Sequence, residues 1–327
     1  MRRLFMVGLG LVLILYLMPA VWSLGGMGAE RAPETLAVPE AVPAGGESAQ
    51  APADHTKVTV EIDGKPTELP LEAYVEGVVA AEISSDFPIE AIRAQAVAAR
   101  TYAVYKIDRG RPDAHPDADL CDDFHHCAAY RNVAVETASG NDLSRVQQAV
   151  KDTEGEILTY ENAPIAAVFH CASGPRTEAA GDVWGEDIPY LQSAVSPGGS
   201  ACGEYEKSVT VDADEFRKKV KETFPSADVS GAPNTWFKAS ERTEAGGIRT
   251  VKLGGATVEG TAVRELFGLN STNFTITTTA DGITFHTIGY GHGVGLSQYG
   301  AKYMAEQGQS YQEILSHYYK DTVLAHV

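Results

Sequence analysis

Histidine and cysteine side chains gather in one short stretch of the sequence. Cys121 and Cys127 lie with His115, His125 and His126 within 13 residues, although the whole chain has only 4 cysteines and 9 histidines. Two thiolates and two imidazoles form the closed tetrahedral set of structural zinc, whereas catalytic zinc keeps a position open for water. A disulfide between the two cysteines is the alternative. Because a disulfide does not account for the histidines, we predict zinc.

A second group suited to chemistry is Glu82. It follows the apolar run 78–81 and precedes Ile83, and burial raises the pKa of a carboxyl because it disfavours the charged form. A carboxyl that keeps its proton near neutrality can protonate the leaving oxygen of a glycosidic bond. The alternative is an exposed carboxylate at a helix end, the common position of glutamate.

A hydrolase usually adds a second carboxylate to such an acid. Asp86 and Glu76 are the nearest in the sequence, but neither is an obvious partner. A single carboxyl suffices if the sugar's own 6-hydroxyl attacks and Glu82 accepts its proton, acting first as acid and then as base. That is the chemistry of a lytic transglycosylase.

Glycines alternate along residues 289–295 near the end of the chain. Their spacing fits neither the dinucleotide fingerprint nor a P-loop. Glycine at this density lets the backbone approach either neighbouring chain or an extended ligand such as a glycan. The polar residues of this segment are then either contacts to sugar hydroxyls or internal groups, with His292 as a core histidine and Ser297 as a helix cap. No G-x-S-x-G nucleophile elbow is present.

The elements that must position these residues are mixed, without a regular β-α-β rhythm or a repeat. The sequence predicts a single α+β domain. The expected helices and strands are a strand over 58–62, helices over 71–83 and 88–106, strands over 156–160, 165–169, 208–211, 250–253, 273–279 and 283–287, and a closing helix from the capping box of Ser310 and Glu313 to about Tyr319.

The chain divides into three parts by composition. Arg2 and Arg3 precede the apolar run 4–24, which is long enough to span a bilayer. We predict an uncleaved signal anchor over 1–24 and a disordered tether over 25–54, rich in Ala, Gly and Pro. The extracytoplasmic domain is then 55–327. A net charge of −18 excludes nucleic acid as a partner.

Two long motifs resemble the stage II sporulation protein D family. The first runs from Leu71 through Ala81-Glu82-Ile83 to Tyr102, and the second from Gly289-Tyr-Gly-His292-Gly to Tyr319; Val183-Trp184-Gly185 between them also fits. The resemblance implies a peptidoglycan lytic transglycosylase that cleaves glycan strands to 1,6-anhydro-muramyl products during sporulation engulfment, with Glu82 as the catalytic acid.

The resemblance also implies site residues. Zinc in this family takes a His, Cys, His, Cys set at the spacing of His115, Cys121, His126 and Cys127, which leaves His125 spare. We predict substrate contacts at these positions of the matching segments: Arg100, Ser173, His292, Ser297, Gln298 and Tyr299. The loop at Ser173 departs from the family, because Pro175 stands where a glycine is usual. A disulfide between Cys171 and Cys202 is plausible here.

The implied partners are peptidoglycan glycan strands, an amidase of the stage II sporulation P type and a polytopic membrane protein of the M type. The implied location is the septal or engulfing membrane, with the catalytic domain outside the cytoplasm. Two other functions compete with the enzyme: a noncatalytic wall-binding amidase enhancer, and a zinc-dependent peptidoglycan hydrolase.

Overall fold

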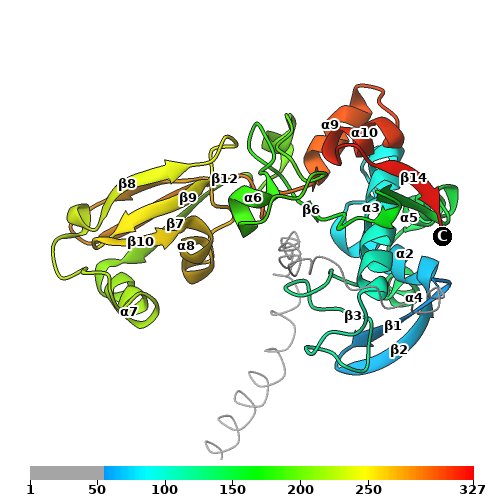
Figure 1. Ribbon diagram of the computed structural model, residues 1–327, viewed down its shortest axis with the longest axis horizontal. Helices are drawn as coiled ribbons and strands as arrows, with labels where there is room; N and C mark the ends of the chain where they lie inside the picture. Colours follow the sequence, from blue (N-terminus) through cyan, green and yellow to red (C-terminus); the bar gives the residue numbers. More distant parts are fainter. Residues whose placement is uncertain (1–54) are drawn as a thin grey trace, which may run out of the picture. The chain divides into compact units, whose positions relative to one another are not determined.

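The computed structural model describes residues 55–327. The anchor and tether that we predict for residues 1–54 lie outside this range. Within the described range, no helix is both long enough and apolar enough to cross a bilayer. Helices and strands follow one another in irregular order (Figure 1), which confirms the mixed helix and strand class predicted from the sequence.

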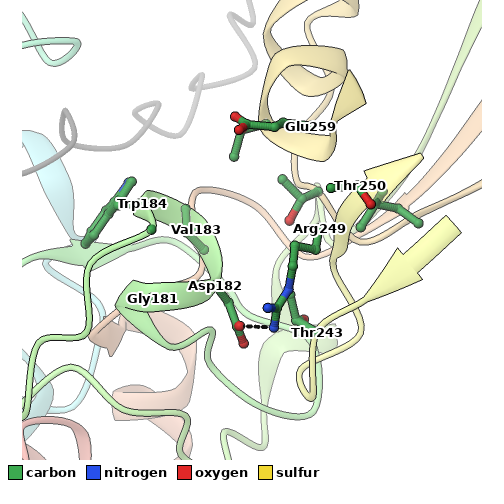
Figure 2. A pocket seen from close by; sticks show the side chains of 12 residues that line it. Gly181, Asp182, Val183, Trp184, Thr243, Arg249, Thr250 and Glu259 are labelled. Atoms are coloured by element: carbon green, nitrogen blue, oxygen red, sulfur yellow. Dashed lines mark hydrogen bonds and ion pairs between the residues drawn. The ribbon is translucent and has the colours of Figure 1, made fainter. Parts of the chain in front are cut away.

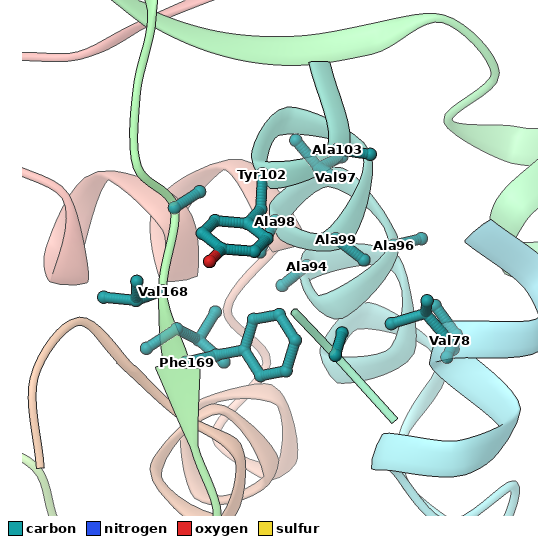
Figure 3. Close-up of a cluster of buried hydrophobic side chains, with 14 of the residues drawn as sticks. Val78, Ala94, Ala96, Val97, Ala98, Ala99, Tyr102, Ala103, Val168 and Phe169 are labelled. Atoms are coloured by element: carbon teal, nitrogen blue, oxygen red, sulfur yellow. The ribbon is translucent and has the colours of Figure 1, made fainter. Parts of the chain in front are cut away.

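A central helix, α3 (Ile89–Asp108), organises the first of two hydrophobic cores. It contacts α2 (Leu71–Glu82), α5 (Ser144–Asp152), α9 (Gln298–Glu306) and α10 (Tyr311–Tyr318). Figure 3 shows the short side chains that allow this close packing, Ala94, Ala96, Ala98, Ala99 and Ala103, with Tyr102, Val168 and Phe169 beside them. The sequence predicted one apolar face, but α3 is buried on nearly every side because neighbours surround it.

Small sheets border this first core. Their strands are β1 (Lys57–Ile62), β2 (Lys65–Pro70) and β3 (Leu120–Cys121) in the order β2-β1-β3; β4 (Glu156–Tyr160), β5 (Ala163–Pro164) and β14 (Val323–His326) in the order β14-β4-β5; and the parallel pair β6 (Phe169–His170) and β13 (Leu296–Ser297). The β1–β2 hairpin turns at Asp63 and Gly64, which both have positive φ. Two short helices complete the region, α4 (Val133–Ala138) and α6 (Ala180–Trp184).

A second hydrophobic core is formed by residues from about 206 to 288. It contains the sheet β11-β12-β7, with β7 (Glu206–Asp212), β11 (Phe274–Thr278) and β12 (Gly282–Ile288), the sheet β10-β9-β8, with β8 (Phe237–Arg242), β9 (Ile248–Leu253) and β10 (Ala256–Glu259), and the helices α7 (Ala213–Thr223) and α8 (Gly260–Phe267). Phe216 stacks on both Trp236 and Phe267, with ring centroids 4.9 Å apart in each pair. These aromatic contacts give the core its own packing.

One predicted strand is wrong in most of its length. The sequence predicts a strand over 165–169, but only Phe169 is in a strand, together with His170. Ala167 N donates to the Ile165 carbonyl, and Val168 N donates to the Ala166 carbonyl, both at 2.8 Å. These bonds across two residues kink the backbone, so it cannot form a ladder. The apolar run reflects burial in the first core rather than strand pairing.

Candidate active site

Glu82 is the last residue of α2, at the edge of the first core. Ile83 follows in an extended conformation, and its N–H donates to the Val79 carbonyl. Val78, Val79 and Ile83 are buried, whereas Glu82 is partly exposed. The helix therefore ends where its final carboxyl leaves an apolar wall and reaches a surface.

Two N–H groups contact the Glu82 carboxyl, one on each oxygen. Ala129 N donates to Oε1 at 3.2 Å, and Gln298 Nε2 donates to Oε2 at 3.3 Å. Burial raises the pKa of Glu82 to about 7, and the two hydrogen bonds lower it only in part. Among the described residues, no second carboxylate contributes to this shift. The carboxyl can therefore hold and release a proton near neutrality.

Gln298 reaches Glu82 because α9 begins at this residue. Ser297 caps the helix, since its Oγ accepts a hydrogen bond from Gly300 N at 3.3 Å. The Gln298 amide also lies 3.4 Å from the Gln95 Oε1, on α3. Sequence reasoning missed Gln95, although an uncharged polar residue inside a run of buried alanines was the available signal.

The glycine-rich segment, residues 289–295, packs against another part of the same polypeptide. Its glycines therefore serve internal packing, the first of the two roles considered for them in the sequence. Gly295 has φ 72°, and a Cβ there would lie 2.2 Å from the Val168 carbonyl oxygen, so only glycine fits. This close approach lets β13 pair with β6. The segment therefore leads directly into Ser297, which caps α9 and so places Gln298 beside the Glu82 carboxyl.

His292 and Ser297 are internal rather than in contact with solvent. His292 is 6% exposed, and its Nδ1 accepts a hydrogen bond from Val294 N at 3.0 Å. Burial lowers the pKa of His292 well below its usual value and that of the neighbouring His170 to about 4. Both imidazoles are therefore neutral, and neither supplies the acid.

Arg100 does not lie at a substrate surface, which corrects the sequence prediction. Its side chain is fully buried in the first core. The guanidinium donates to both carboxylate oxygens of Glu72, at 2.8 and 2.6 Å, and to the carbonyls of Val150 and Glu156. These bonds hold the guanidinium inside the protein, so Arg100 links α3 to α2, α5 and β4.

Tyr299 lies at the surface of the site, whereas Ser173 is buried, at 3% exposed. Tyr299 is partly exposed, and its ring meets Phe87 edge-on at a centroid distance of 5.1 Å. Ser173 N donates to the Ser297 Oγ, whereas the Ser173 hydroxyl has no partner among the described residues. Ser173 also lines a narrow crevice with His292.

The four predicted zinc ligands lie together around β3, with His115 before the strand, Cys121 at its end, and His126 and Cys127 in the loop that follows. Their ligand atoms all lie within 4.8 Å of one another. The His115 Nε2 is 3.0 Å from the His126 Nδ1, and the Cys127 Sγ is 3.5 and 3.4 Å from these two nitrogens. His125, the spare histidine, is exposed.

This donor set fits zinc on geometric grounds. Ligands at about 2.0–2.3 Å from a tetrahedral zinc stand apart by distances of this order. The His115 Nδ1 lies 2.8 Å from the Ala118 carbonyl, so it donates there and leaves Nε2 to face the cluster. With four protein ligands, no position remains open for a reacting water.

The segment between β3 and α4, residues 122–132, is called the His/Cys loop, and it packs closely against α2. A Cβ on Gly77 would lie 2.2 Å from a ring carbon of Tyr130, so the absence of a side chain there lets the tyrosine sit on the helix. Arg131 N donates to the Gly77 carbonyl, and Tyr130 stacks on Tyr74. Between these contacts and Cys127, the same loop presents Ala129 N to Glu82.

Cys171 and Cys202 form a second thiol pair. Both are buried, and their sulfurs are 3.6 Å apart. All four cysteines are free thiols in the structure. The disulfide considered for Cys171 and Cys202 therefore stays a prediction. This pair adjoins the site because Tyr299 N donates to the Cys171 carbonyl.

Comparison with known proteins places the chain among sporulation proteins. Residues 64–160 match a family model described as stage II sporulation protein. The chain is 37% identical over 262 residues to Stage II sporulation protein D of Bacillus subtilis (strain 168), covering 79% of this chain and 75% of that protein. It is 38% identical over 257 residues to the protein of that name in Bacillus amyloliquefaciens, covering 77% and 73%. Amidase enhancer of Bacillus subtilis is 27% identical over 301 residues, 76% of this chain and 40% of that protein.

Proposed function

Because the chain belongs to the stage II sporulation protein D family, we propose that it is a peptidoglycan lytic transglycosylase with Glu82 as general acid and base. The observation that carries the proposal is the Glu82 carboxyl, whose pKa burial raises to about 7. A group with that pKa is suited to give and take a proton at neutral pH.

In the proposed reaction, one carboxyl performs both proton transfers. The Glu82 proton goes to the glycosidic oxygen as the bond between that oxygen and the muramyl C1 breaks. The resulting carboxylate then takes the proton of the sugar's 6-hydroxyl, and O6 forms a bond to C1. This yields a 1,6-anhydro end and restores the acid. The N–H groups of Ala129 and Gln298 stabilise the carboxylate between the two steps.

Zinc, when bound, would supply a structural crosslink among His115, Cys121, His126 and Cys127. The four residues would hold the loop that carries Ala129 against α2. Because the set is closed, it does not favour a zinc-dependent hydrolase. The raised pKa of Glu82 likewise favours an enzyme over a noncatalytic amidase enhancer, since no binding role needs a protonated carboxyl there.

The proposal extends to the location and the partners. An anchor over residues 1–24 would place residues 55–327 outside the cytoplasm at the septal or engulfing membrane. There the enzyme would work on glycan strands beside an amidase of the stage II sporulation P type and a membrane protein of the M type.

Glycan cleavage by the full-length chain tests the proposal. We expect Glu82→Gln to reduce the release of soluble fragments from purified peptidoglycan by about 10²–10⁴-fold, because the amide cannot supply a proton. Glu76→Gln is the matched control, because Glu76 is also partly buried on α2, but its carboxylate pairs with Gln147 rather than with the groups that contact Glu82. Equal loss in both variants, or full activity in Glu82→Gln, would contradict the proposal.

A further inference from the structure

A pocket of about 300 Å³ lies between α6 and the sheet β10-β9-β8 (Figure 2). Val183 and Trp184 line it from α6, and Arg249, Thr250 and Glu259 line it from the sheet. The volume is at the small end of the range of about 300–1,000 Å³ typical of ligand pockets. None of the residues that contact the Glu82 carboxyl lines this pocket.

The walls of the pocket come from the two hydrophobic cores, and polar contacts join them. Arg249 forms an ion pair with Asp182, drawn as the dashed line in Figure 2. Next to it, Gly247 N donates to the Glu178 Oε1 at 3.1 Å. These contacts preform the pocket, so a ligand does not have to order it.

Trp184 gives the pocket one aromatic wall. The indole is partly exposed and is held by the His292 ring, whose centroid is 5.3 Å away. Figure 2 shows the Glu259 carboxylate pointing into the space opposite Trp184. An apolar ring facing hydrogen-bonding groups suits a ligand with one apolar face and polar edges, such as a pyranose ring.

The charge of the lining narrows the ligand further. Asp182 and Glu259 contribute two carboxylates against the single guanidinium of Arg249. This excess of negative charge disfavours phosphates and peptide carboxylates. The remaining polar lining consists of threonine hydroxyls, which pair with neutral hydroxyl and amide groups: Thr243, Thr250, Thr261 and Thr272.

A chain of shared residues leads from this pocket to Glu82. Thr272 lines both the pocket and the crevice that contains Ser173. Ser173 N donates to Ser297, and Gln298, the next residue, donates to Glu82. Ser173, Ser297 and Gln298 are at most 3% exposed, so these contacts couple the pocket to the Glu82 carboxyl through the protein interior.

We propose that the Trp184 pocket is a carbohydrate subsite that binds an N-acetylhexosamine ring of the glycan strand, at a distance from the bond that is cleaved. The acetamido group and the ring hydroxyls would pair with the threonines and with Glu259, and the ring face would rest on Trp184. Its identification as a subsite for the substrate rests on the proposed function.

Binding of chito-oligosaccharides of increasing length, measured by calorimetry, tests this proposal. The full-length chain carries Glu82→Gln to prevent cleavage. In that background we expect Trp184→Ala to weaken binding of the longer oligomers about tenfold or more, Trp184→Phe to retain part of the affinity, and the shortest oligomers to be little affected.

Glu259→Ala provides a second variant that does not disturb the cores. Glu259 is exposed, and its side chain does not cap α8. We expect a loss of about fivefold, equivalent to one hydrogen bond of about 1 kcal/mol, whereas the matched control Glu241→Ala, on the exposed edge of β8, leaves affinity unchanged. Unchanged binding in both Trp184→Ala and Glu259→Ala, or weakened binding of free stem peptides instead of sugars, would overturn the subsite.

This experiment separates the two proposals. If oligomers bind through Trp184 but the wild-type chain cleaves no glycan, the proposed function fails and the carbohydrate site stands. If the wild-type chain cleaves glycan through Glu82 and the pocket variants bind normally, the proposed function stands and the subsite is wrong.

Discussion

The Glu82 site, at the end of α2, and the His/Cys cluster, in the loop packed against that helix, are two neighbouring groups of polar residues. Their polar atoms are arranged differently. In the cluster, four ligand atoms turn toward a common point, and the His115 Nδ1 is fixed by a carbonyl. At Glu82, single N–H groups touch each carboxylate oxygen, and burial still raises the pKa to about 7. The cluster thus offers a complete set of four ligands, whereas the two hydrogen bonds to the Glu82 carboxylate do not offset the cost of burying its charge.

Under the proposed function, this difference assigns a structural role to the His/Cys cluster and the proton transfers to Glu82. A closed tetrahedral set has no position for a substrate atom. A carboxyl with a raised pKa and a partly exposed side chain can exchange a proton. Ala129 joins the two, because the loop that contains Cys127 also presents this N–H to Glu82. Zinc would thus affect proton transfer by Glu82 only indirectly, by fixing the position of the Ala129 N–H.

The largest expected effect is a loss of stability when a ligand of the His/Cys cluster is removed. If it did not occur, the contrast between a structural cluster and a reactive carboxyl would fail. We expect Cys127→Ser to lose zinc and to reduce the free energy of unfolding by several kcal/mol, because metal binding energy contributes to folding. Thermal unfolding and metal analysis of the purified chain check this. His125→Ala is the matched control, since His125 is exposed and outside the set. A zinc-free variant of full stability would contradict the structural role.

The second thiol pair sharpens the comparison, because Cys171 and Cys202 have the same side chains without the two imidazoles. We expect oxidised glutathione to convert this pair to a disulfide, with glutathione as the reduced product. Closing a loop between residues 31 apart should stabilise the fold by about 4 kcal/mol. Peptide mapping and unfolding before and after oxidation, with Cys202→Ser as control, measure this. If Cys121 and Cys127 formed the disulfide instead in the zinc-loaded protein, the assignment of these two cysteines to zinc and of Cys171 and Cys202 to a disulfide would be wrong.

The smallest expected effect concerns the stability of the wild type against Glu82→Gln as pH changes. The folded protein keeps the Glu82 proton up to about pH 7, whereas the unfolded chain loses it near the ordinary glutamate pKa of 4.5. The native state binds more protons between these values, so wild-type stability falls as pH rises through that window.

Glu82→Gln cannot titrate, so it should become more stable than the wild type by about 1–3 kcal/mol above pH 7. Urea unfolding at about pH 5 and about pH 8 measures the change. Glu241→Gln is the control, because that side chain is exposed. A difference between Glu82→Gln and the wild type that does not change with pH would mean that burial does not perturb Glu82.

Local signals in the sequence predicted part of the fold correctly. The capping box of Ser310 and Glu313 begins α10, and the strand predicted over 58–62 forms most of β1. In the second core, the sequence predicted β7, β9, β11 and β12 close to their observed bounds but missed β8, β10, α7 and α8. The pairing of the predicted strands was not foreseen, because it joins segments far apart in the sequence, as in the β12–β7 ladder. Long-range pairing is not readable from local pattern.

The candidate site was predicted unevenly for the same reason. Residues close in sequence, such as Cys121, His126 and Cys127, converge as predicted from their spacing. Arg100 was misassigned, because its partner Glu72 lies a helix away and no local pattern reveals the buried pair. The Gln95 and Ala129 contacts were missed because they depend on how α3 and the His/Cys loop pack around α2.

The mass of the muramyl ends newly formed on the released glycan fragments tests the central claim most directly. Intramolecular attack by the 6-hydroxyl gives ends that are one water lighter than the products of hydrolysis. We predict anhydro ends from the wild-type chain, in amounts that fall above pH 7 as Glu82 ionises, and essentially none from Glu82→Gln. Hydrated ends from the wild type, or anhydro ends released equally by Glu82→Gln, would contradict the account.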